Sequence, residues 1–187
     1  MTSSSFLRVA AGVPACSVAQ PHVNAERISA LAKSAHEQCV HIMALPELCL
    51  TGYTARDLLL DTTLIQEVTT ALNTLMRNTT SLDPVLIIGC PVESRHRLYN
   101  VAVVMQRGKI LGVVPKSFIP RTAEFEESRW FRSGRSLEED SVSINGHSVP
   151  FGTHLIFEHL GAAFGIELCE DLWHARPPSS ELFTEGA

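Results

Sequence analysis

Short apolar runs alternate along the chain with stretches in which apolar residues recur at helical spacing. Runs at residues 7–13, 40–44 and 85–90 predict buried β-strands, because short continuous apolar segments suit a strand that is covered on both faces. Two helices are predicted between these strands. The first follows a cap at Asn24, and the second covers residues 63–77. Their apolar faces consist of Ile28, Leu31, Ala32 and Ala35 in the first, and Leu64, Val68, Ala71, Leu72 and Leu75 in the second.

The second half of the chain is predicted to contain two hairpins. One joins residues 99–106 to 109–114 across Arg107-Gly108, and the other joins residues 154–157 to 160–165. A further helix is expected to start at Pro177-Pro178-Ser179 and to end at a cap formed by Gly186. Helices interleaved with strands and hairpins predict a mixed α/β layered fold.

Two irregular segments separate these elements. Residues 57–60 are predicted to form a short helical segment or turn. Residues 115–135 are predicted to form a long charged loop that carries four aromatic side chains, Phe118, Phe125, Trp130 and Phe131. Loops of this length are usually functional or mobile.

Residues 165–173 hold the most informative candidate for chemistry. Cys169 follows the apolar run 160–165, predicted to be a buried strand, and precedes Glu170 and Asp171, which suit the first turn of a helix. A side chain at such a strand-to-helix turn is accessible to a substrate, and nearby backbone N–H groups can stabilise a thiolate or a developing oxyanion. Cys169 is therefore a candidate nucleophile. The alternative is a buried cysteine that packs as a small hydrophobic residue.

Two charged residues also follow predicted strands. Glu47 comes just after the run 40–44, and Lys116 comes just after residues 109–114. Taken singly, Glu47 could be a solvated loop charge and Lys116 a surface cation. Together with Cys169 they place three chemically complementary residues at the C-terminal ends of strands, where α/β sheets gather their sites.

Several motifs, taken in order, resemble a known family. Residues 43–53 around Glu47, 98–104 and 107–117 up to Lys116, 150–153, 169–171 and 177–179 are similar to segments of the nitrilase superfamily of carbon–nitrogen hydrolases. They most resemble the amino-terminal glutaminase domain of glutamine-dependent NAD synthetases. The resemblance extends from about Phe6 to the last residue, and it rests on the order and spacing of the motifs.

This resemblance implies a fold and a domain boundary. The expected fold is the nitrilase-like α-β-β-α sandwich with mixed sheets, incomplete at the C-terminus. Residues 1–187 would form a single carbon–nitrogen hydrolase (glutamine amidohydrolase) domain that is truncated, because a further strand, a serine-rich segment and an ATP-dependent synthetase domain follow in the family. A sheet left with an open edge would favour self-association.

The resemblance also implies residue roles. Glu47 would be the general base, Lys116 the cation that stabilises the tetrahedral intermediate, and Cys169 the nucleophile. Four further positions are expected to bind substrate or to orient the lysine: Glu124 as a second glutamate, Thr122 where the family usually has a tyrosine, Glu170, and Tyr53.

Composition narrows the functional classes. A net charge of −5 without a basic stripe argues against nucleic-acid and membrane-surface roles. The eight histidines form no HxxxH or HExxH pattern, so no metal site is predicted, and no GxxxxGK[ST] loop is present. The five cysteines lack CxxC spacing and are expected to be reduced, which favours a cytoplasmic location.

The function predicted from these features is release of ammonia from glutamine through a thioester, serving glutamine-dependent NAD synthesis from deamido-NAD. No cofactor is expected for this domain, and ATP and Mg would act only through the absent synthetase domain. The expected partners are glutamine, that synthetase domain and further copies of the chain in a homo-oligomer. The alternatives are a stand-alone ω-amidase or carbamoyl hydrolase, and a catalytically inactive fragment that acts only by association.

Overall fold

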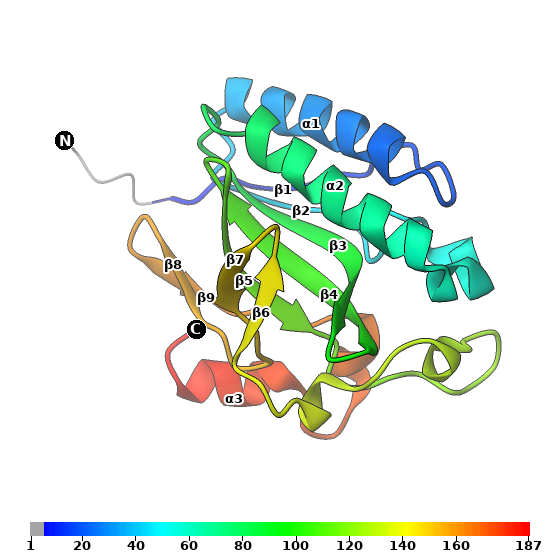
Figure 1. Cartoon of the computed structure of the whole chain (residues 1–187). Coiled ribbons are helices and arrows are strands. Elements are labelled where there is room, and N and C mark those ends of the chain that lie inside the picture. The colour runs from blue at the N-terminus through cyan, green and yellow to red at the C-terminus, as the bar shows by residue number, and fades with distance from the viewer. Residues whose placement is uncertain (1–5) are drawn as a thin grey trace.

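A mixed five-stranded sheet organises the computed structural model, which describes residues 6–187 (Figure 1). Its strands lie in the order β1-β2-β3-β4-β5, with β1 to β3 parallel and β3 to β5 antiparallel. Strands β2 and β5 therefore end at the same edge of the sheet. The strands are β1 (Val9–Ala11), β2 (Ile42–Ala44), β3 (Val85–Ser94), β4 (Arg97–Gln106) and β5 (Lys109–Pro115).

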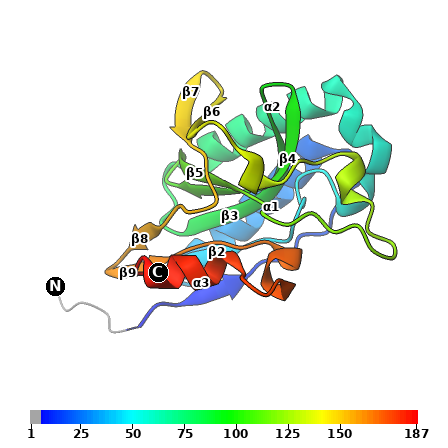
Figure 2. The ribbon, with the colours of Figure 1, turned by 90° about the horizontal axis from the view of Figure 1, so that it is seen from below.

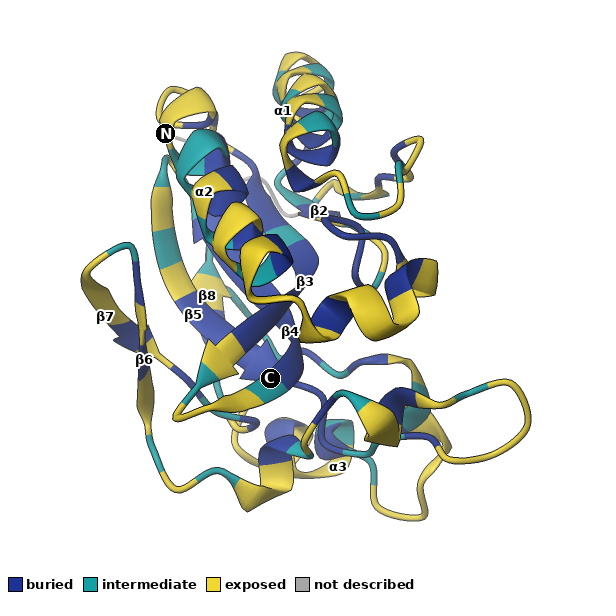
Figure 3. Ribbon diagram, turned by 45° about the vertical axis from the view of Figure 1, so that its right-hand side comes forward, coloured by how far each residue is buried: buried dark blue, intermediate teal, exposed yellow. Residues whose placement is uncertain are grey.

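Two helices, α1 (Pro21–Glu37) and α2 (Thr62–Asn78), cover one face of this sheet (Figure 1). Helix α2 begins where the Asp61 carboxylate accepts a hydrogen bond from the Thr63 N–H at 2.8 Å, which is ordinary N-capping. Its buried residues lie on the side of the helix toward the sheet, and its outer side is exposed (Figure 3). The apolar residues predicted from helical spacing form this buried face, so the prediction of α2 is confirmed.

The predicted helix cap at Asn24 is wrong. Helix α1 begins at Pro21, whose restricted φ suits the first turn of a helix, and Asn24 lies inside the helix with no exposed surface. The Asn24 side chain instead exchanges two 2.8 Å hydrogen bonds with the Ser17 backbone and donates to the Leu50 carbonyl at 3.0 Å. The Asn24 side chain thus joins helix α1 to the segments around Ser17 and Leu50.

The β4–β5 hairpin turns at Arg107-Gly108 as predicted. Two other hairpins are absent from the sequence-based prediction. Strands β3 and β4 pair along nine positions around a turn at Arg95 and His96, which both have positive φ. Strands β6 (Ser141–Ile144) and β7 (His147–Pro150) pair around Asn145-Gly146, which is a strong signal for a hairpin turn.

The second face of the sheet packs against the chain after residue 154, which holds β8 (Phe157–His159), β9 (Ala162–Phe164) and α3 (Pro178–Thr184) (Figure 2). The apolar contacts there are made by Val85, Ala102, Val104, Val114, Phe157, Ile166 and Leu168. The β8–β9 hairpin is confirmed, but the expected burial of residues 160–165 is not. Leu160 is 64% exposed because it lies in the turn between β8 and β9, and residues 162–165 are only half-buried.

The long loop after β5 is held in place by side chains. Its first 3₁₀ turn, Glu127–Arg129, lies beside the 3₁₀ segment Tyr53–Leu60. The Asp57 carboxylate accepts hydrogen bonds from Arg129 at 2.6 and 2.9 Å and from the Trp130 indole N–H at 2.8 Å. An apolar cluster beneath the two segments consists of Leu48, Ala55, Leu59, Leu64 and Phe131. The loop is thereby fixed against the edge where β2 and β5 end.

Within residues 6–187, no helix combines the length and the apolar character needed to cross a membrane. All five cysteines are free.

Candidate active site

Glu47 reaches the middle of the sheet edge because the chain crosses over β3 after leaving β2. The Leu45 N–H donates to the Ile87 carbonyl at 2.9 Å, and the Leu50 N–H donates to the Gly89 carbonyl at 3.2 Å. A Cβ atom on Gly89 would lie 2.4 Å from the Pro46 carbonyl oxygen. Only glycine allows so close an approach of the two backbones. The position of Glu47 therefore requires a glycine at residue 89.

Lys116 follows β5 and is completely buried. Its backbone N–H donates to the Asn100 carbonyl on β4 at 2.8 Å. Its ammonium nitrogen Nζ lies 2.6 Å from Glu47 Oε1 and 2.7 Å from Glu127 Oε1. One buried cation is thus held between two carboxylates, which offsets the cost of removing the charge from water.

The two glutamates differ in how far their oxygens are occupied. Glu127 Oε1 accepts from Lys116 and from the Tyr53 hydroxyl at 2.7 Å, and Glu127 Oε2 accepts from the Asn100 amide at 3.2 Å. Glu47 accepts from both Lys116 and Asn100 at 2.6 Å on the same oxygen, Oε1. Within the described part of the chain, no hydrogen bond reaches Glu47 Oε2. Glu127 is therefore a saturated counter-ion, whereas Glu47 keeps one oxygen available for a proton.

Burial and charge act in opposite directions on this pair. Burial raises the pKa of Glu47, and so does the nearby Glu127, while Lys116 and the Asn100 hydrogen bond lower it; the net pKa is above the ordinary value. Burial alone lowers the pKa of Lys116, but the two carboxylates outweigh it and the net pKa is raised. Lys116 consequently stays a cation through the neutral range.

Cys169 begins a 3₁₀ turn, Cys169–Trp173, directly after Leu168 in extended conformation. Its side chain is exposed and its φ is +45°, a conformation that costs a residue with a Cβ about 1–3 kcal/mol. The pKa of the thiol is raised by partial burial and then by Glu47, and it is lowered by Lys116. The thiol therefore shares one electrostatic environment with both residues and is protonated at neutral pH.

Asp171 joins the turn of Cys169 to the end of β5. Its buried carboxylate accepts hydrogen bonds from the Leu168 N–H at 3.0 Å, the Ser117 N–H at 3.2 Å and the Phe118 N–H at 2.7 Å. Burial raises the pKa of Asp171, and these backbone N–H groups lower it. Because Ser117 and Phe118 directly follow Lys116, one side chain holds the lysine and cysteine segments together.

The four positions expected to bind substrate are placed differently. Tyr53 contacts the cluster through Glu127, and Glu170 is half-buried beside His174, 3.8 Å from its imidazole. Thr122 and Glu124 are exposed in the long loop. The second-glutamate role expected for Glu124 is corrected, because the 3₁₀ turn Glu127–Arg129 directs Glu127, and not Glu124, to the lysine.

Three residues of the cluster had no predicted role: Asn100, Glu127 and Asp171. A polar residue inside the apolar run 98–104 is the signal that points to Asn100. The other two depend on contacts between segments far apart in the sequence.

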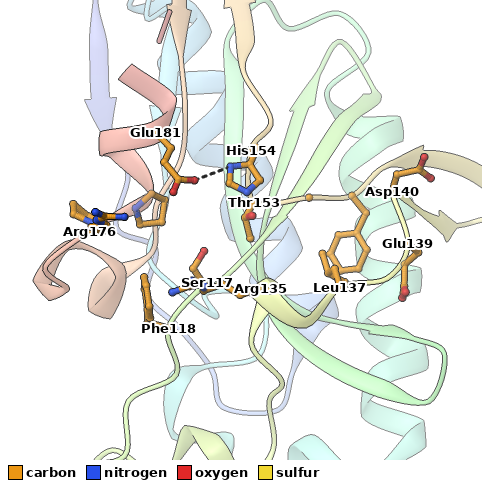
Figure 4. A pocket seen from close by; sticks show the side chains of 15 residues that line it. Ser117, Phe118, Arg135, Leu137, Glu139, Asp140, Thr153, His154, Arg176 and Glu181 are labelled. Carbon is orange, nitrogen blue, oxygen red and sulfur yellow. Dashed lines mark ion pairs between the residues drawn. The ribbon is translucent and has the colours of Figure 1, made fainter. Parts of the chain in front are cut away.

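A groove of about 570 Å³ is lined in part by Ser117 and Phe118, the two residues that follow Lys116. Figure 4 shows the side chains that line this groove. The groove extends to His154 and Glu181, which form a 3.4 Å ion pair. Glu47, Lys116 and Cys169 do not line it. The Glu47–Lys116–Cys169 cluster, which combines a thiol, a carboxylate and a cation in one electrostatic environment, is therefore the candidate active site. Across residues 6–187, no group of three or more His, Cys, Asp or Glu side chains is arranged to hold a metal ion.

A mixed α/β sheet with an accessible cysteine at a strained turn, beside a buried lysine held by two carboxylates, defines a candidate thiol-dependent hydrolase site. A family model described as carbon–nitrogen hydrolase matches residues 8–179. The chain therefore belongs to the carbon–nitrogen hydrolase family, and its fold is that of the nitrilase superfamily.

Individual relatives agree with this assignment. The glutamine-dependent NAD(+) synthetase of Mycobacterium tuberculosis is 40% identical over 185 residues, which are 97% of this chain and 27% of that protein. The protein of the same name from Aquifex aeolicus is 33% identical over 147 residues, 79% of this chain and 23% of the relative. The chain thus spans about a quarter of the length of these relatives.

Solved structures show the same fold. The crystal structure of a glutamine-dependent NAD(+) synthetase from Cytophaga hutchinsonii superposes with a TM-score of 0.79 at 26% identity, covering 89% of this chain and 28% of that one. An amidase from Nesterenkonia sp. superposes with a TM-score of 0.69 at 17% identity, covering 96% and 60%. The latter supports the fold alone.

Proposed function

We propose that the chain is a thiol amidohydrolase domain that releases ammonia from glutamine, with Glu47, Lys116 and Cys169 as its catalytic residues. The observation that carries the proposal is the geometry at Lys116. Its buried ammonium lies 2.6 Å from a glutamate that keeps a free oxygen, and both groups act electrostatically on an exposed thiol. The identity of the substrate is supported by relatives described as glutamine-dependent NAD(+) synthetases.

The first step is attack of the thiol sulfur on the amide carbon. Because the pKa of Cys169 is raised, little thiolate exists at neutral pH, and the proton must leave as the new bond forms. Glu47 Oε2 is the free acceptor for that proton. The raised pKa of Glu47 makes it a stronger base than an exposed glutamate would be.

The tetrahedral intermediate then carries negative charge on the former carbonyl oxygen. The Lys116 ammonium and a backbone N–H near Glu170 are the donors proposed to face it. Loss of one such donor commonly costs about 3 kcal/mol in the activation barrier. Glu47 returns its proton to the nitrogen, ammonia departs, and a thioester remains on Cys169.

A water molecule, deprotonated by Glu47, then attacks the thioester, releasing glutamate and the free thiol. This sequence uses no metal ion or organic cofactor. In the longer relatives the ammonia would be used by an ATP-dependent synthetase region, and that region is the proposed partner, together with further copies of the chain. ATP and Mg would act there and not at Cys169.

The test measures ammonia released from glutamine, from short aliphatic amides and from carbamoyl amino acids. Glutamine is expected to be turned over fastest. Faster turnover of the other amides would replace glutaminase with a stand-alone amidase or carbamoyl hydrolase of the same family.

A second measurement follows the intact mass after exposure to an electrophilic glutamine analogue. One adduct is expected, absent in Cys169→Ala and slowed in Lys116→Ala. Cys39→Ala removes another exposed cysteine and should leave the adduct unchanged. A well-folded chain that forms no adduct and releases no ammonia would support the alternative of a catalytically inactive chain that acts by association.

A further inference from the structure

Asn100 is a polar residue on an apolar side of the sheet. It lies on β4, paired with Pro91, and its side chain is on the same face as Ala102 and Val104. It has no exposed surface. Among the buried side-chain nitrogen and oxygen atoms of the described residues, its Oδ1 is the one that lacks a hydrogen-bond partner. An unsatisfied buried acceptor is costly, so its retention calls for an explanation.

The orientation of the amide explains the unsatisfied oxygen. The Nδ2 group donates to Glu47 Oε1 at 2.6 Å and to Glu127 Oε2 at 3.2 Å. The reversed orientation would direct Oδ1 at two carboxylate oxygens, and acceptor would face acceptor. The amide therefore gives both of its hydrogens to the glutamates and leaves its own oxygen unpaired.

These two hydrogen bonds add to the stabilisation that Lys116 alone gives to two carboxyl groups. Two carboxyl groups, those of Glu47 and Glu127, face the single ammonium group of Lys116. Two carboxylates at one site repel each other, and the usual result is that one of them takes up a proton. A neutral donor bridging both carboxylates favours their ionised forms without adding a charge.

We propose that Asn100 is a positioning residue that keeps Glu47 ionised and oriented, so that Glu47 Oε2 stays free to accept the thiol proton. Asn100 and Lys116 occupy the same oxygen of Glu47, and that choice leaves the second oxygen open. The groups that face Glu47 are Lys116, Glu127, Tyr53 and Cys169. Of the neutral groups, Asn100 is the one that donates to Glu47. The part of the inference that concerns rate rests on the proposed function, and the part that concerns Glu47 ionisation does not.

The test uses Asn100→Leu, which removes both hydrogen bonds at similar volume, and Asn100→Asp, which keeps the shape and adds a carboxyl group. The ionisation of Glu47 is followed by the ¹³C shift of its labelled carboxyl carbon, assigned by the signal lost in Glu47→Gln. The titration midpoint of Glu47 is expected to move upward in both variants. This readout needs no turnover, so it decides the inference even if glutamine is not the substrate.

In the ammonia-release assay, the acid side of the pH–rate profile should move upward with the Glu47 midpoint. The rate at mildly acidic pH should fall by roughly ten-fold, as expected for a perturbed general base, and recover toward wild type as the pH rises. A purely structural defect would lower the rate equally at every pH.

Asn24→Leu is the matched control, because Asn24 is equally buried and makes hydrogen bonds elsewhere. It should lower the melting temperature without moving the Glu47 titration. An unchanged Glu47 midpoint in a folded Asn100 variant would overturn the inference. If Asn100→Leu does not fold, the smaller uncharged variant Asn100→Ala decides the question, because the added carboxyl group of Asn100→Asp raises the Glu47 midpoint by charge repulsion in any case.

Discussion

Asp171 is predicted to couple the cysteine turn to the lysine strand, and Asp171→Asn tests this coupling with little change of shape. In the structure the carboxylate accepts three backbone hydrogen bonds, of 2.7, 3.0 and 3.2 Å, and is buried. An asparagine has one acceptor oxygen. If that oxygen replaces Oδ2, it keeps the bonds from Leu168 and Ser117, and its NH₂ group then faces the Phe118 N–H.

The magnitude follows from these contacts. A buried donor left without a partner costs about 1–3 kcal/mol, and two charge-assisted bonds that become neutral lose about 1 kcal/mol each. The raised pKa of Asp171 shows that burial already disfavours the charged form, and removing the charge recovers part of this. The net loss of unfolding free energy is therefore expected to be about 2–4 kcal/mol, which is a large share of the stability of a typical domain.

The assay is urea denaturation of Asp171→Asn beside the ammonia-release rate. The rate should fall by roughly 10- to 100-fold under conditions where the variant is still folded, because small misplacements of reacting groups are that costly. Asp140→Asn changes an exposed carboxylate and should stay within about 0.5 kcal/mol of wild type. A folded Asp171→Asn with wild-type stability and rate would refute the coupling.

The remaining predictions concern the two carboxylates and the turn over β3. Glu127→Gln should lose about 3 kcal/mol of unfolding free energy in urea denaturation, because it breaks a buried ion pair. The exposed Glu124→Gln should lose less than about 0.5 kcal/mol. A larger loss in Glu124→Gln than in Glu127→Gln would mean that Glu124 is the partner of Lys116. Gly89→Ala should lower the unfolding free energy by about 1–3 kcal/mol through overpacking and lower the ammonia-release rate, because its Cβ would lie 2.4 Å from the Pro46 carbonyl oxygen. In the control Gly152→Ala, the atom nearest to the new Cβ is 3.9 Å away, so its melting temperature and rate should equal those of wild type. The rate should fall on the acid side of the pH–rate profile as Glu47 becomes protonated and can no longer accept the thiol proton. Because burial raises the pKa of Glu47, the midpoint of this acid limb should lie above about 4.3, the pKa of free glutamate. A midpoint at or below that value would exclude Glu47 as the base.

The sequence is enough to place Glu47, Lys116 and Cys169 at the ends of strands, because apolar runs followed by charged or nucleophilic residues are local features. That β2 and β5 end at the same edge cannot be obtained from the same local patterns. It requires the β3–β4 hairpin, which reverses the chain once more before β5. The turn of that hairpin, Arg95-His96, lacks the glycine or asparagine that usually marks such a turn.

The rest of the cluster depends on packing between distant segments. Glu124 and Glu127 are both glutamates in one long loop, and sequence spacing does not tell which of them faces inward. The contact of Asp57 with Arg129 and Trp130 fixes the 3₁₀ turn and thereby selects Glu127. Sequence position identifies both glutamates as candidates, and the tertiary contact at Asp57 determines which of them reaches Lys116.

The charge balance of the cluster gives a physical reason for its composition. With Glu47 and Glu127 ionised, Lys116 protonated and the Cys169 thiol neutral, the cluster carries one net negative charge. In the proposed mechanism the thiol proton moves to Glu47 as negative charge appears on the substrate oxygen, so the net charge stays the same and the negative charge only changes place. Lys116 is proposed to be adjacent to both locations, and the Glu127 carboxyl group lies beside it at 2.7 Å. An arrangement in which charge is relocated without being created needs little reorganisation around the reacting atoms, and this is the main source of electrostatic catalysis.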